Sequence, residues 1–271
     1  MDPVTKAAIS AAGEKAADVL KSESQAFLSA VLPEPGKALG GWFADWINAS
    51  RHKNLIKITA QAKRNLAEAN LTPKEVPLNI IHPALEVASL EENDALQTVW
   101  ANLLANAADS AQTNPVQVSF VSTLRELSTR EVTFLESLHK AVNADEKGKR
   151  PLAPHFKIGG FTEEQLLDLY GQAGLLRNLK PGVFAASLEV DGHGYEMETD
   201  LSDFRGMMDI LIRNRILKEY LYPKPIRIGN YGEGPIFSMA SSSIEIETQR
   251  AYQITEFGSA FVNACRAQRE Q

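Results

Sequence analysis

The chain has 271 residues, of which 44% are hydrophobic and 23% are charged, and its formal net charge is −6. This length and composition suffice for a globular core divided over one or two domains. The balance of 34 Asp and Glu against 28 Lys and Arg excludes the broad basic surface that drives non-specific nucleic-acid binding, and the single cysteine, Cys265, excludes an internal disulfide and a multi-thiolate zinc site.

The first predicted element is a helix over residues 5–31, and we assign residues 1–38 to this Ala-rich helix and a linker. Its apolar positions recur at helical spacing, at Ile9, Ala12, Ala16, Val19, Leu20 and Phe27. The start lacks the basic and apolar blocks of a secretory signal, and no apolar run reaches about 18 residues. We therefore expect a cytoplasmic protein, with peripheral membrane association left open.

Residues 39–114 are predicted to form a helical domain. A long helix over 42–70 is followed by a segment that Pro77 and Pro83 divide into short apolar pieces. Ser89 and Glu92 have the spacing of a capping box for the next helix. That helix carries a regular apolar stripe, formed by Leu96, Val99, Trp100, Leu103, Leu104 and Ala107. Asn102 and Asn106 lie on another face, where we expect them to bond neighbouring backbone.

Residues 115–271 predict a winged-helix-like α+β domain. Capping pairs begin two helices, at Ser128/Glu131 and Thr162/Gln165, and a third helix covers 203–216. Strands are expected at 216–222 and 242–255, followed by a closing helix that Thr255 caps and in which Cys265 is a small core residue. The expected fold class is mainly α, with an N-terminal helical domain followed by this winged-helix-like C-terminal domain.

Several stretches carry a family resemblance between about Gly41 and Ala267. They are GWFADWINASRHKNLIKITAQAKRNL, the segment PKEVPLNIIHPALEVASLEENDALQTVWANLLANAAD, the pair Leu127-Ser128, and the closing pattern Tyr-x-x-Thr-x-x-Gly-x-x-Phe. With these features the chain resembles the bacterial Abi-alpha family, a domain of unknown function named for abortive infection. The resemblance implies a role in defence against phage and implies no catalytic residues.

We accordingly expect a non-enzymatic interaction or sensor component of this defence. It would act by self-association or by binding a protein partner, with a phage component as candidate trigger and with no cofactor. No pair of histidines has metal-ligand spacing. Three weaker motifs have structural explanations: Arg150 to His155 as a Pro-rich turn, Gly229, Gly232 and Gly234 as a hairpin tip, and Glu196, Glu198, Asp200 and Asp203 as an exposed strand and a helix cap.

Two alternatives stay open. A DNA-binding regulator would use a basic patch on the third helix and wing, namely Arg205, Arg213, Arg215, Lys218, Lys224 and Arg227, although acidic residues share the same surface. The patch is equally a candidate protein contact. A membrane-perturbing effector would use residues 5–50 together with an aromatic and basic face, namely Trp42, Trp46, Arg51, Lys53 and Lys57, which is also a candidate partner face.

Overall fold

The computed structural model describes most of the chain. The described residues are 3–33, 49–111, 116–146, 160–176, 180–181, 189–190, 193–194, 197–198, 201–223 and 248–267. Within them the fold is mainly helical, with a small three-stranded antiparallel sheet. The expected mainly helical class is confirmed.

The chain forms two compact units. The first consists of Met1–Glu136 together with Glu256–Gln271, and the second is Ser137–Thr255. The second unit is therefore an insertion within the first. The division between units falls elsewhere than the boundary expected near residue 115.

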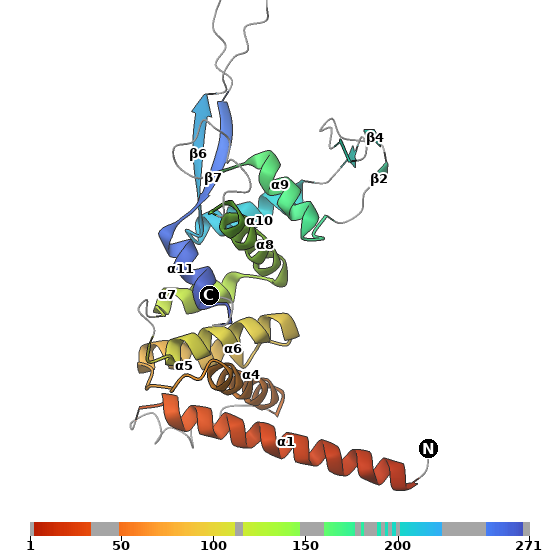
Figure 1. Cartoon of the computed structure of the whole chain (residues 1–271), viewed down its shortest axis with the longest axis vertical. Helices are drawn as coiled ribbons and strands as arrows, with labels where there is room; N and C mark the ends of the chain where they lie inside the picture. The colour runs from red at the N-terminus through yellow and green to blue at the C-terminus, as the bar shows by residue number, and fades with distance from the viewer. Residues whose placement is uncertain are drawn as a thin grey trace, which may run out of the picture. The chain divides into compact units, whose positions relative to one another are not determined.

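The first unit is a set of packed helices (Figure 1). Helix α1 (Pro3–Val31) packs on α4 (Ala49–Glu68), which in turn packs on α6 (Asp94–Ala108). Helix α5 (Leu78–Ala88) contacts α4, α6 and α7 (Val118–Glu126). The start of α8 (Thr129–Glu146) and helix α11 (Glu256–Ala264) complete the unit, and α11 also packs on α6. The first and last helical segments of the chain thus share one core.

Helix α6 is the centre of this core. The stripe predicted from its sequence is buried, with Trp100 1% exposed and only Ala107 half-buried. The predicted capping box is wrong, because Asn93 caps the helix and its side chain accepts hydrogen bonds from the backbone N–H groups of Ala95 and Leu96. The Ser89 hydroxyl instead donates to the carbonyl of Glu86, at the end of α5.

Helix α5 corrects a second expectation, since it continues through Pro83 without a break. A proline in a helix lacks the N–H that would bond the carbonyl four residues earlier, here that of Asn79. Burial of Ile81, Ala84, Leu85 and Ala88 along one face stabilises the helix despite this loss. The segment that sequence spacing divided is one amphipathic helix.

The second unit contains the sheet. Its strands are β1 (Phe161–Thr162), β6 (Leu217–Pro223) and β7 (Thr248–Ile254), arranged in the order β1-β7-β6. Helices α9 (Glu163–Gln172) and α10 (Ser202–Arg213) precede β6. Two further antiparallel pairs join β2 (Lys180–Pro181) to β5 (Met197–Glu198), and β3 (Glu189–Val190) to β4 (His193–Gly194).

Local signals place the helices of the second unit correctly. The predicted Thr162/Gln165 capping box is present, with both reciprocal hydrogen bonds. The buried face of α10 consists of Phe204, Met207, Met208 and Leu211, and the strand expected from residue 216 is β6. Asp203 is not the cap that the sequence suggested, because Leu201 holds that position without a side-chain cap; Asp203 lies in the first turn of α10, where its charge suits the helix dipole.

Three helices end in the same way, with a left-handed residue after the last turn. The residue is Asn70 after α4, Gly174 after α9 and Arg215 after α10. In each case the next residue donates its N–H five positions back, as from Ile216 to the carbonyl of Leu211. This is the Schellman arrangement, which glycine or asparagine normally occupies. Arginine at φ 59 is therefore an unfavourable choice at that position.

Candidate functional site

The outer face of α10 carries the predicted arginines. Arg205 and Arg213 are exposed on this helix, and Arg215 is exposed just beyond it. Asp203 and Asp209 are exposed on the same helix, so the face alternates in sign. A uniformly basic strip, which DNA phosphates would favour, does not occur among these described residues.

The predicted wing contributes less to this face. Lys218 is exposed on β6, and its ammonium group lies 4.9 Å from the ring centroid of Tyr220, a cation–π contact within one strand. Lys224 and Arg227 lie outside the described residues.

The aromatic and basic face near α4 is only partly described. Trp42 and Trp46 lie outside the described residues, whereas Lys53 is exposed and Arg51 is half-buried on α4. Lys57 donates to the carboxylate of Asp94 over 2.6 Å, and this hydrogen bond, followed by the charge of Lys57, lowers the pKa of Asp94. Lys57 is therefore engaged within the first unit. None of the described helices combines the length and apolar content needed to cross a bilayer.

One stretch of α1, from Glu14 to Val19, is exposed around its whole circumference. Every residue from Glu14 to Val19 is exposed, and Val19 is 57% exposed. Burial begins further along, at Ser24, Phe27 and Val31, where α1 contacts α4. In Figure 1 the N-terminal half of α1 continues past α4. This is an unoccupied helical surface within the described chain.

Asn102 and Asn106 have a structural role that the sequence indicated only in part. Asn106 donates to the carbonyls of Ala264 and Arg266, over 2.8 and 2.9 Å, and Asn102 donates to that of Cys265 over 3.1 Å. The Asn102 side chain also accepts a hydrogen bond from Asn65 of α4. These amides satisfy carbonyls that the end of α11 leaves without helical partners. The expected backbone partner is confirmed, but it belongs to a distant segment.

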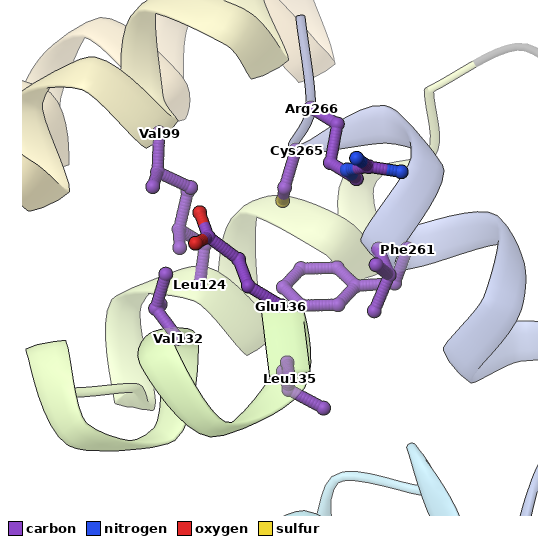
Figure 2. Close-up of a pocket in the computed structure, with 9 residues that line it drawn as sticks. Val99, Leu124, Val132, Leu135, Glu136, Phe261, Cys265 and Arg266 are labelled. Carbon is purple, nitrogen blue, oxygen red and sulfur yellow. The ribbon is translucent and has the colours of Figure 1, made fainter. Parts of the chain in front are cut away.

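An apolar pocket lies beside this contact, lined by α6, α7, α8 and α11 (Figure 2). Phe261 and the stem of Glu136 face one another in it, and the sulfur of Cys265 points inward. The free volume of about 20 Å³ accommodates about one water molecule. The pocket is a packing defect of the helical core and is too small for an organic ligand.

Cys265 is half-buried as a residue, and its sulfur is turned into this pocket, so it lies at the edge of the core and not fully within it as predicted. Burial of its thiol raises the pKa of Cys265 well above the ordinary range. The nucleophile in cysteine chemistry is the thiolate, and the protonated thiol is unreactive. The side chain contributes to packing beside Phe261 and Leu124.

The remaining sequence motifs receive little structural description. The segments 150–155 and 229–234 lie outside the described residues, and so do Glu196 and Asp200. Across the ranges that are described, no three His, Cys, Asp or Glu side chains gather closely enough to hold a metal ion.

The comparison with protein families decides the classification. The chain matches the family described as "Abortive infection alpha" over residues 50–265. The chain belongs to this family. Neither curated proteins nor solved structures gave a match. Membership of the Abi-alpha family associates the chain with abortive infection and confirms the resemblance seen in the Trp100 to Ala107 segment and the closing helix.

Proposed function

We propose that the chain is a non-enzymatic component of abortive-infection defence that acts by pairing with a second copy of itself through α1. The observation that carries the proposal is the all-round exposure from Glu14 to Val19. Such a helix is only marginally stable in water, because helices gain most of their stability from packing. A second copy would supply the missing packing surface.

The charges of α1 favour a copy of the same helix in antiparallel orientation. Glu14 and Lys21 are exposed and lie two turns apart on one side of α1. An antiparallel copy places each Glu14 opposite Lys21 of the other chain, and two-fold symmetry makes this contact twice. Ala17 lies between them near the same side of α1 and is small enough for close approach of the two backbones.

Sedimentation velocity over a range of concentrations tests this pairing. We expect Glu14→Lys to weaken self-association, and the charge-swapped E14K/K21E variant to restore it. Leu90→Lys is a control, since Leu90 is 51% exposed in the same unit but follows α5 and is not part of α1. A monomer at every concentration, or equal association of E14K and the unaltered chain, would exclude this mechanism.

Infection of bacteria that carry the gene tests the biological part. Culture collapse and phage yield should both change with the unaltered chain and not with E14K. Protection by a monomeric E14K variant would show that defence does not require self-association. Equal phage yields with and without the gene across a broad panel would exclude the defence role.

We infer that the second unit adopts a winged-helix arrangement. The support is the order β1, α9, α10, β6, β7, with β7 central in the sheet. Winged helices serve as DNA readers or as protein-contact modules. The mixed charge of α10 favours the protein contact. Salt-dependent binding of a labelled duplex that is lost in an R205A/R213A/R215A variant would instead support the DNA-binding alternative.

A further inference from the structure

A cleft of about 480 Å³ lies in the second unit, between one flank of α10, the start of α9 and the strands β6 and β7. Its volume is within the range of ligand sites in proteins. The antiparallel register assembles its sheet wall, because Glu219 pairs with Tyr252 and Arg250 is the next residue on the same face of β7. The cleft is distinct from the apolar pocket of the first unit.

The cleft combines an apolar floor with a charged rim. Phe204 and Met208 of α10 line it and are 2% and 4% exposed, and Tyr252 is 4% exposed. The rim carries three carboxylates and two guanidinium groups, from Glu163, Asp209, Glu219, Arg205 and Arg250. An apolar floor below a charged rim suits a ligand with an aliphatic stem and an ionic head.

The sheet wall neutralises one of the two guanidinium groups. Arg250 lies 3.4 Å from the Glu219 carboxylate. Its hydrogen bond with Tyr252, followed by the charges of Glu219 and Tyr252, raises the pKa of Arg250. Burial and then the negative field of Glu163 raise the pKa of the Tyr252 phenol, against the opposite effect of Arg250. The carboxylate of Glu163 therefore acts electrostatically inside the cleft.

The remaining rim charges determine whether the cleft favours a cationic or an anionic ligand. Once Arg250 and Glu219 are paired, Glu163 and Asp209 face the cleft against Arg205 alone. Phosphate groups would be repelled by this surplus of carboxylate. A lysine or arginine side chain matches both features, since it lays its methylene stem on apolar surface and directs its cationic head to the rim.

We propose that this cleft binds a single lysine or arginine side chain presented by an extended segment of a partner protein. The cationic head lies between Glu163 and Asp209, and the stem lies over Phe204, Met208 and the Tyr252 ring, which adds a cation–π contact. Arg205 at the rim opposes this ligand. The assignment stands whether or not α1 self-associates.

Titration of short peptides followed by NMR tests the assignment. The probes are Gly/Ser nonapeptides with one central lysine or arginine, and the neutral controls carry norleucine or citrulline at that position. We expect the charged peptides alone to shift the backbone amides of α10 and β7. The E163Q/D209N variant should bind at least about fivefold more weakly, and R205Q about twofold more tightly. E164Q is the matched control, because Glu164 is exposed on the same turn of α9 and does not line the cleft.

Several results would overturn the proposal. These are equal affinity of E163Q/D209N and the unaltered chain, shifts with the norleucine peptide as large as those with the lysine peptide, and the absence of any shift with the charged peptides. Binding of spermidine without binding of either charged peptide would assign the cleft to a free polyamine and would also overturn the partner-protein assignment.

Discussion

The side-chain amide of Asn106 lies 2.8 Å from the backbone carbonyl of Ala264, although the two residues are 158 positions apart in the chain. The contact joins the centre of the first unit to the end of α11. Asn106 is 1% exposed, so water cannot replace the hydrogen bond if it is lost.

Replacement of Asn106 should therefore destabilise the first unit. We expect N106A to lower the free energy of unfolding by about 2 kcal/mol, because the carbonyls of Ala264 and Arg266 lose a buried donor. N106D should cost more, since it places an acceptor against two acceptors. Urea unfolding followed by circular dichroism measures both values. Equal stability of N106D and the unaltered chain would refute this account of the contact.

A buried hydrogen bond between Ser24 of α1 and Thr59 of α4 joins these two helices. Loss of one partner should cost more stability than loss of both. The two hydroxyl oxygens lie 2.7 Å apart, and Thr59 also donates to the carbonyl of Leu55. T59V should lower the free energy of unfolding by about 1–3 kcal/mol, because it leaves the buried Ser24 hydroxyl without its hydrogen-bond partner on α4. The S24A/T59V double variant should be more stable than T59V. A double-mutant cycle measures the coupling, and strictly additive effects would contradict the proposed pairing.

Arg215 gives a prediction of the opposite sign. R215G should raise the free energy of unfolding of the second unit by about 0.5–1 kcal/mol, because glycine adopts a positive φ without the steric cost paid by arginine. R213G, in ordinary helical conformation, should lower it by about 1 kcal/mol. Asn70→Gly should change stability by only a few tenths of a kcal/mol, because asparagine tolerates this conformation. Destabilisation by R215G would show that Arg215 makes a compensating contact.

The thiol of Cys265 makes stability depend on alkaline pH. Burial raises its pKa in the folded state, whereas in the unfolded chain the thiol ionises near pH 8.5. Its contribution is fully present below about pH 8.5 and is lost as the pH rises above that value, with a slope of at most ~1.4 kcal/mol per pH unit. The free energy of unfolding, measured from pH 7 to 10, should fall above about pH 8.5 in the unaltered chain. The C265A variant should lack this part of the decrease. Rapid alkylation of the native thiol by iodoacetamide at pH 8 would contradict the burial.

Local sequence signals predicted much of this fold because their physics is local. The Thr162/Gln165 capping box and the apolar stripe around Trp100 each depend on spacings of a few residues. The Ser89/Glu92 capping box was predicted wrongly because a second capping residue, Asn93, follows close behind in the sequence. Asn93 caps α6 in the structure. The end of α10 lies at Arg213, earlier than the predicted end at residue 216. The sequence does not signal this end, because the left-handed residue that follows the helix is Arg215 and not the usual glycine.

The candidate sites were less accessible to sequence reasoning. Arg205 was visible as an outward residue of a predicted helix, but its neighbours Glu163 and Arg250 come from elements far along the chain. Only the register of β6 and β7 brings Arg250 and Glu219 together. The spacing of apolar residues in a sequence indicates which side of a helix or strand is buried. It does not indicate which charged side chains from distant elements line the same cleft, because that depends on how the strands pair.

The insertion of Ser137–Thr255 into the first unit has a consequence for biosynthesis. During translation, α6 emerges long before the carbonyls that Asn102 and Asn106 bind, so both buried amides stay without these acceptors until residues 264–266 leave the ribosome. A chain interrupted within the insertion would expose the α6 surface that α11 normally covers, and would be a natural target for quality-control proteases.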